Sequence, residues 1–230
     1  MTDSIFLLSE DGRMRALERR GFLSEDVLQR LLATHPELLV GDQIDLSDPR
    51  RWILITREAA IPGEEDGGGR WSVDHLYLDQ DAVPTLVEVK RSQDTRIRRE
   101  VVGQLLEYAA NAVSYWSPEF MRQRFEDASH AAGLDPEERV RDLVGSDADA
   151  DDFWERARTN LQAGRVRLLF VADVIPTELR QIVEFLNDQM DPAEVLAIEV
   201  KQYKADGVST LVPTVIGQTV AAQVKRGGKR

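Results

Sequence analysis

Residues 85–91 read TLVEVKR, and this short stretch carries the clearest structural signal in the chain. Apolar and charged residues alternate in it as they do in a β-strand, where residues i and i+2 project from the same face. Glu88 and Lys90 therefore share one face, and Val87 and Val89 share the other. Two opposite charges among apolar neighbours indicate either a solvated ion pair or part of a functional site.

The two segments before this strand also have strand character. Residues 51–62 (RWILITREAAIP) are rich in Ile and Trp and end at a Pro-Gly pair, and residues 70–80 (RWSVDHLYLDQ) alternate between apolar and polar types. Residues 79–84 (DQDAVP) have the composition of a turn. We therefore expect antiparallel strands in which Asp74 lies within a few residues of the position opposite Glu88.

Helical periodicity flanks these strands. Residues 24–34 (SEDVLQRLLAT) begin with a serine that can cap a helix, and their apolar residues recur at helical spacing. After the third strand, the apolar pattern from Ile97 to about Ala112 predicts a long amphipathic helix. By the same reasoning we expect mostly helix over 117–163, a buried strand over 165–173, a helix over 176–190, and strands over 194–203 and 208–216.

This order of elements predicts an α/β protein with one mixed β-sheet flanked by helices. We expect an αβββαβ core followed by a C-terminal αββ extension, within a single domain over residues 1–220. Its expected parts are N-terminal helices (1–45), a core that carries the motif (46–116), a helical insertion (117–163), and a strand-helix-strand-strand segment that completes the sheet (164–220). The basic tail, 221–230, is expected to be disordered.

The composition limits the possible functions. The chain has 230 residues, 42% of them hydrophobic and 30% charged, as in ordinary globular domains. It has no cysteine, which excludes thiol nucleophiles and thiolate metal sites, and only three histidines, without metal-ligand spacing. The first residues lack the pattern of a signal peptide, and no apolar run approaches the ~20 residues of a membrane span. We therefore expect a cytoplasmic protein with no membrane partner.

The charge is unevenly distributed along the chain. A net charge of −12 argues against nonspecific coating of nucleic acid, because phosphate contacts come from Lys and Arg. Residues 90–99 (KRSQDTRIRR) nevertheless carry five basic residues and one acidic residue. Acidic residues concentrate in 63–68 and 146–152. The second of these segments lacks the glycine and the final glutamate of an EF-hand loop, and we interpret it as a helix-capping loop.

Asp74 and Glu88 together indicate a metal site. Two carboxylates at one point of a sheet repel each other, and burying either one without compensation is costly. A divalent cation resolves that repulsion, and carboxylate oxygens with waters are the ligands that Mg²⁺ prefers. The alternative is an ordinary cross-strand ion pair between Glu88 and Lys90 on a solvated face, which needs no function.

Residues 25–112 resemble the PD-(D/E)XK nuclease superfamily, and in particular the NucS-type nuclease domains and the Holliday-junction resolvases. The resemblance covers less than half of the chain, and Val73 stands where the family name has proline. It implies a restriction-endonuclease-like core, with Asp74 as the acid of the second strand, Glu88 as the acid of the third and Lys90 as the motif lysine.

The resemblance also implies roles for residues outside the strands. Gln104 and Tyr108 match the Gln-x-x-x-Tyr helix motif of RecB-like members, and Gln104 is expected to assist catalysis. Glu37 stands where some members carry a helical metal ligand, and Glu58 is a rival for that third acid. The residues expected to hold the nucleic-acid backbone are Arg91, Arg96, Arg98, Arg99 and Tyr108.

The implied activity is hydrolysis of phosphodiester bonds in DNA with Mg²⁺ or Mn²⁺ as cofactor. Asp74, Glu88 and Glu37 are the expected metal ligands, and Lys90 is expected to position the attacking water or to neutralise charge on the phosphate. Two alternatives stay open. The first is a catalytically silent nuclease-fold module that binds nucleic acid or a protein partner, and the second is an unrelated α/β protein. A homodimer is also possible.

Overall fold

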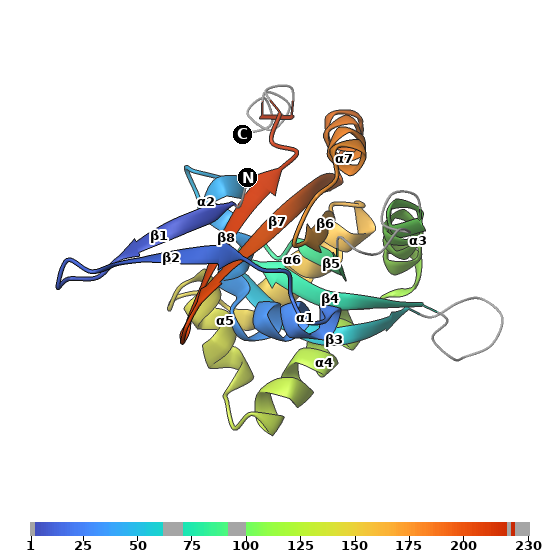
Figure 1. The fold of residues 1–230 in the computed structure, drawn as a ribbon. Helices are drawn as coiled ribbons and strands as arrows, with labels where there is room; N and C mark the ends of the chain where they lie inside the picture. Colours follow the sequence, from blue (N-terminus) through green and yellow to red (C-terminus); the bar gives the residue numbers. More distant parts are fainter. Residues whose placement is uncertain (1–2, 62–70, 92–99, 220–221, 224–230) are drawn as a thin grey trace.

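The computed structural model describes residues 3–61, 71–91, 100–219 and 222–223 (Figure 1). Eight strands occur in this part of the chain: β1 (Ser4–Leu8), β2 (Met14–Arg19), β3 (Trp52–Ile61), β4 (Trp71–Asp79), β5 (Pro84–Lys90), β6 (Arg167–Ala172), β7 (Glu194–Ala205) and β8 (Val208–Ile216). The helices are α1 (Glu25–Thr34), the 3₁₀ helix η1 (Pro36–Leu39), α2 (Gly41–Ile44), α3 (Glu100–Tyr115), α4 (Pro118–Ala131), α5 (Pro136–Val144), α6 (Ala150–Gln162) and α7 (Thr177–Gln189).

The eight strands form a single mixed sheet in the order β1-β2-β7-β6-β5-β4-β3, with β8 paired to β7. Strands β3, β4 and β5 form an antiparallel meander, whereas β5, β6 and β7 run parallel. Tyr203 and Lys204 pair with both β2 and β8, so these two strands occupy opposite edges of β7. The predicted α/β class, the mixed sheet and the C-terminal helix-strand-strand order are confirmed.

Local chemistry explains why the chain turns sharply after β4 but crosses over after β5. Asp79 Oδ1 accepts hydrogen bonds from the backbone N–H groups of Asp81 (3.0 Å) and Val83 (2.9 Å), which closes a tight turn. Parallel strands cannot be joined by such a turn, and the connection from β5 to β6 instead runs through α3, α4, α5 and α6. Because the sheet is covered on both faces there, every residue of β6 is buried.

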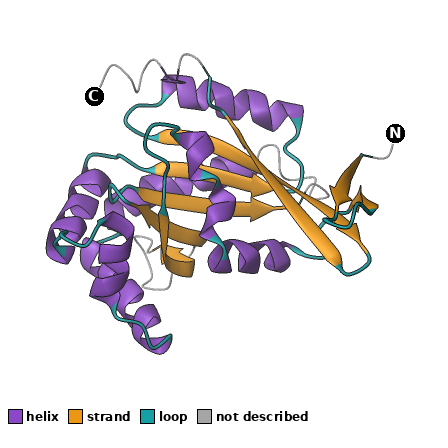
Figure 2. Ribbon diagram, turned by 90° about the vertical axis from the view of Figure 1, so that its left-hand side faces the viewer, coloured by secondary structure: helices purple, strands orange, loops and turns teal. Residues whose placement is uncertain are grey.

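Helices pack on both faces of the sheet (Figure 2). One hydrophobic core joins the sheet to α3, α4, α5, α6 and α7 and includes Leu86. The other joins the opposite face to α1, η1 and α2 and includes Val87 and Val89. The two faces predicted for 85–91 are therefore confirmed. Among the helices of the described ranges, none has the length and apolar character needed to cross a bilayer.

One predicted region is wrong. The helices expected over 1–45 begin only at Glu25, and residues 4–19 form the β1–β2 hairpin instead. The Ser-Glu-Asp-Gly sequence explains this, since Gly12 has a φ of +79° and its N–H donates to the Ser9 carbonyl at 2.9 Å. The expected turn at 63–68 and most of the expected tail at 221–230 lie outside the described residues.

Candidate functional site

Two carboxylates meet where β4 begins and β5 ends. The β4–β5 register pairs His75 with Val87, so the next step along the ladder brings Asp74 opposite Glu88. Asp74 Oδ2 accepts a hydrogen bond of 2.7 Å from the Val89 backbone N–H, which fixes the aspartate against the neighbouring strand. The sequence placed Asp74 within a few residues of this position, and the structure brings the two acids together.

Lys90 completes the cluster from the same face of β5. Its Nζ lies 2.9 Å from Glu88 Oε1 and 3.8 Å from an oxygen of Glu25. Glu25 is the first residue of α1, and Ser24 caps that helix by accepting a hydrogen bond of 3.3 Å from the Val27 N–H. The cap therefore sets where α1 begins and brings a third acid toward the lysine.

Burial and neighbouring charges shift the pKa values of the side chains in this cluster. Glu88 is 2% exposed, and its burial, together with the charge of Asp74, raises its pKa to about 7 despite the ion pair with Lys90. Burial likewise raises the pKa of Asp74, although its bond from Val89 works in the opposite direction. Burial alone would lower the pKa of Lys90, but the carboxylates of Glu88, Asp74 and Glu25 together outweigh burial and raise that pKa.

One oxygen of this cluster lacks a partner. Glu88 Oε2 is buried and accepts no hydrogen bond from the described residues, a costly arrangement for a carboxylate oxygen. Carboxylate oxygens are ligands that a hard divalent cation prefers, so Glu88 Oε2 and the neighbouring Asp74 carboxylate would supply part of the coordination of such an ion, with waters supplying the rest. Within the described ranges, however, no group of three or more His, Cys, Asp or Glu side chains converges tightly enough to hold a metal by itself.

Gln104 and Tyr108 lie beside the cluster on α3. Gln104 donates a hydrogen bond from its side-chain amide to the Tyr108 hydroxyl. Burial raises the pKa of that hydroxyl, and the charge of Glu88 contributes in the same direction. The Tyr108 residue is only 5% exposed and belongs to the hydrophobic core, which leaves little of its ring for the nucleic-acid contact expected from the sequence.

The structure offers a different third acid from the one expected. Glu37 lies on η1, its side chain is 72% exposed, and its carboxylate lies 3.1 Å from His35 Nδ1. The acids whose charge acts on Asp74 are instead Glu25 and Glu58. Glu58 is an exposed residue of β3 with a φ of +50°, a strained backbone conformation for glutamate. Sequence reasoning missed Glu25, although its place directly after a helix-capping serine was visible.

The basic segment after β5 is described only at its start. Arg91 is half-buried, and its Nε is a buried donor with no hydrogen-bond partner in the described ranges. The other three arginines expected to hold a nucleic acid, Arg96, Arg98 and Arg99, lie outside the described residues. Their role stays a prediction.

Two other sequence features are structural. Asp149 caps α6 by accepting a hydrogen bond of 2.7 Å from the Asp151 N–H, which confirms the helix-capping interpretation of the acidic loop. His75 is fully buried on the opposite face of β4 from Asp74, with Nε2 2.8 Å from the Gln29 carbonyl. Burial lowers the pKa of His75 to about 4.

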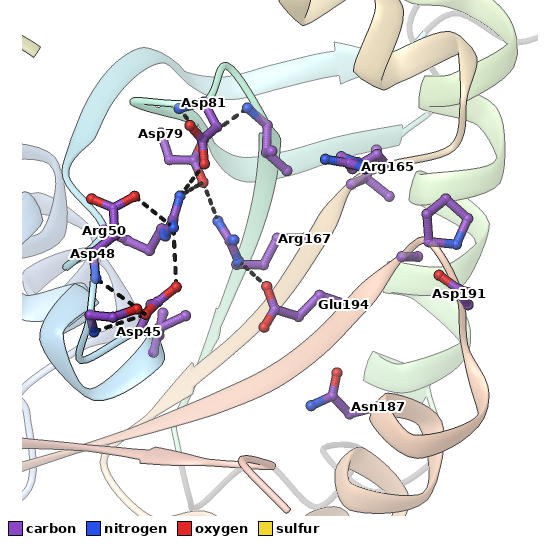
Figure 3. Close-up of a pocket in the computed structure, with 16 residues that line it drawn as sticks. Asp45, Asp48, Arg50, Asp79, Asp81, Arg165, Arg167, Asn187, Asp191 and Glu194 are labelled. Carbon is purple, nitrogen blue, oxygen red and sulfur yellow. Dashed lines mark hydrogen bonds and ion pairs between the residues drawn. The ribbon is translucent and has the colours of Figure 1, made fainter. Parts of the chain in front are cut away.

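A second charged cluster lies at the opposite end of the sheet, beside a cavity of about 500 Å³ (Figure 3). Buried Arg167 donates to Asp79 Oδ2 at 2.9 Å and forms an ion pair with Glu194. Arg50 lies 3.2 Å from Asp45, 2.9 Å from Asp48 and within ion-pair distance of Asp79 and Asp81. The arginines of this cluster lie directly against its carboxylates.

No protein-family model matches this chain, and neither a curated protein nor a solved structure shows significant similarity to it.

Proposed function

We propose that this protein is a metal-dependent nuclease that hydrolyses phosphodiester bonds in DNA, with Asp74, Glu88 and Lys90 at its centre. The observation that carries the proposal is the meeting of one buried and one half-buried carboxylate with a lysine at one end of the sheet, where one Glu88 oxygen has no hydrogen-bond partner among the described residues. A protein that needed only stability would gain from replacing such a pair with apolar residues.

The order of the elements supports the same proposal. Helix α1 precedes the meander of β3, β4 and β5, and α3 begins the connection to the parallel strand β6. This order is compatible with the αβββαβ order expected for a restriction-endonuclease-like core. Asp74 lies on the second strand of that order, Glu88 and Lys90 lie on the third, and Gln104 lies on the following helix, as the resemblance implies.

The residues have separate roles in the proposed reaction. Asp74 and Glu88 would hold a Mg²⁺ or Mn²⁺ ion, which supplies Lewis acidity toward a phosphate oxygen and a water. Lys90 places a positive charge beside them that can neutralise charge developing on the phosphate in the transition state. Gln104 donates a hydrogen bond to the Tyr108 hydroxyl and so positions it near the acids. Glu25 lies 3.8 Å from Lys90 Nζ and helps to position the lysine.

The activity has an expected pH dependence. A carboxylate must lose its proton before it can hold a cation, and the pKa of Glu88 is raised to about 7. We therefore expect cleavage to increase as the pH rises through about 7.

A second candidate function is a nuclease-fold module that binds nucleic acid or a protein without cutting. Two observations favour it: the net charge of −12, and the lack of a converged group of three metal-binding side chains among the described residues. Both candidates share the fold, and only activity separates them.

The test is a cleavage assay with Mg²⁺ or Mn²⁺ on single-stranded, duplex and flapped DNA. We expect cleavage by the wild type, and its loss in Asp74→Asn, Glu88→Gln and Lys90→Ala. The matched control is Glu37→Gln, which removes an exposed acid of the same region and should retain activity. Binding of DNA without cleavage of any substrate would favour the silent module, and wild-type activity in all three site variants would contradict the proposed site.

A further inference from the structure

The β1–β2 hairpin extends away from the rest of the protein (Figure 1). Its strands pair Phe6 with Ala16 and Leu8 with Met14, so these four side chains share one face. Phe6 is 64% exposed, Leu8 68% and Met14 67%, and Ala16 is also exposed. The outer part of this hairpin face is therefore apolar and open to solvent, while Ser4 and the exposed carboxylate of Glu18 lie on the same face nearer the base.

The opposite face anchors the hairpin to the protein. Leu17, which pairs with Ile5, is fully buried. At the base of the hairpin, Arg19 pairs with Tyr203 of β7, and its guanidinium donates to the Asp173 carbonyl at 3.2 Å. These contacts at the base fix the orientation of the hairpin, so its apolar face points away from the rest of the folded protein.

The outer strand of the hairpin is an unprotected edge. Within the described residues β1 pairs only with β2, and its sequence, SIFLL, contains no charged residue. Edge strands of soluble proteins are normally protected by charges, proline or a covering element, because they otherwise associate with other chains. An apolar edge of this kind indicates an interface.

The charge of the hairpin indicates what covers it. The chain as a whole has a net charge of −12, but residues 3–20 contain four acidic and four basic residues. Three of the basic residues are paired within this segment: Arg13 with Asp11 (3.4 Å), Arg20 with Glu18 (2.7 Å) and Arg19 with Asp3 (3.4 Å). The hairpin offers no excess positive charge to a nucleic acid. It does offer a neutral surface where two strongly acidic molecules can approach with little repulsion.

We propose that two copies of this chain associate by stacking the apolar faces of their β1–β2 hairpins, independently of the proposed nuclease function. A two-fold axis between the hairpins brings the same patch of each copy together, so Phe6, Leu8 and Met14 of one copy pack against the same residues of the other. Aromatic residues and methionine are enriched in the centres of such interfaces.

The size of the patch sets the strength of the association. A stable interface of standard size buries about 800 Å² of each partner, and one hairpin face is smaller than that. The dimer should therefore form and dissociate with concentration over roughly 1–100 µM, as weak interfaces do.

Sedimentation equilibrium over that range tests the proposal. We expect the wild type to approach the dimer mass at high concentration, and Phe6→Thr/Leu8→Thr/Met14→Thr to remain monomeric, since threonine retains strand propensity but removes the apolar face. The control Phe185→Gln removes another exposed aromatic residue, on α7, and should dimerise like the wild type. A wild type that stays monomeric over this range would overturn the proposal. This holds even if the triple variant binds DNA less tightly than the wild type.

Single cysteines provide a second measurement that does not depend on weakening the hairpin. The chain has no cysteine, so Leu8→Cys and Leu7→Cys each introduce one thiol, on opposite faces of β1. We expect a bismaleimide to yield covalent dimers of Leu8→Cys and few of Leu7→Cys. Equal yields from the two variants would contradict stacking through the proposed face.

Discussion

The two ends of the central sheet differ in how their carboxylates are paired with cations. Where β4 ends, Asp79 is fully buried but lies 2.9 Å from Arg167. Where the same strand begins, Asp74 faces Glu88, and Lys90 forms an ion pair of 2.9 Å with Glu88. Among the residues that the structure describes, one end therefore has arginines beside its carboxylates, and the other has more carboxylates than cations.

This difference supports the proposed division between charges that stabilise the fold and charges that serve the proposed site. Burial alone would lower the pKa of Arg167, but the charges of Glu194 and Asp79 outweigh it and raise that pKa, so the group stays charged. At the other end, burial raises the pKa of Glu88 to about 7, so its charge is destabilised by its own environment. Groups with strongly perturbed pKa values beside a specific charge partner are candidates for function.

The largest expected effect comes from breaking the neutralised end. Arg167→Leu removes the cation nearest to Asp79, at 2.9 Å, and an ion-pair partner of Glu194, and it leaves Asp79 with Arg50 at 3.8 Å. The free energy of unfolding should fall by about 3–5 kcal/mol. Chemical denaturation at pH 7 measures this loss. The exposed Arg165→Leu is the control and should change stability by less than about 0.5 kcal/mol. Equal effects of the two variants would show that the Arg167 pairs do not stabilise the fold.

At the acidic end, replacing a charged residue should raise stability relative to the wild type at high pH, whereas Arg167→Leu lowers it. The pKa of Glu88 is raised from 4.5 to about 7, so its stabilising contribution is complete below pH 4.5 and is lost as the pH rises through 7. Glu88→Gln has no proton to lose. Its stability relative to the wild type should therefore increase by about 3 kcal/mol between pH 4 and pH 8 in denaturation curves. A difference that does not change with pH would contradict the shifted pKa.

His75, next to Asp74 but on the other face, should show the reverse slope. Its pKa is lowered from 6.5 to about 4, so the stability present above pH 6.5 is lost as the pH falls toward 4. The buried Nδ1 has no acceptor for an added proton. We expect the wild type to lose about 2 kcal/mol between pH 7 and pH 5 relative to His75→Gln. Parallel pH curves for the two proteins would exclude this contribution.

The smallest expected effect concerns the cap that brings Glu25 toward Lys90. Ser24→Ala removes the hydrogen bond to the Val27 N–H and should cost about 1 kcal/mol of stability. Ser117→Ala removes the equivalent cap of α4 and should cost a similar amount. Only Ser24→Ala should also weaken Mn²⁺ binding, measured by titration calorimetry. Equal binding by both variants would show that the start of α1 does not support the site.

The site was predictable from sequence as far as local periodicity extends. The alternation of 85–91 placed Glu88 and Lys90 on one face, and the turn at 79–84 brought Asp74 close to them. Glu25 was missed because its approach to Lys90 depends on how α1 packs on the sheet. The Arg167 cluster was missed for a related reason, since it joins strand ends far apart in the sequence. The β1–β2 hairpin was missed because its apolar residues are exposed.

Metal binding tests the contrast between the two ends most directly. Mn²⁺ is titrated by calorimetry at pH 8 into the wild type, Glu88→Gln at the acidic end, and Asp81→Asn, which removes an acid that contacts Arg50 at the other end. We predict binding by the wild type and by Asp81→Asn, and its loss in Glu88→Gln. Binding that survives Glu88→Gln but disappears in Asp81→Asn would place the cation at the wrong end of the sheet and contradict the account.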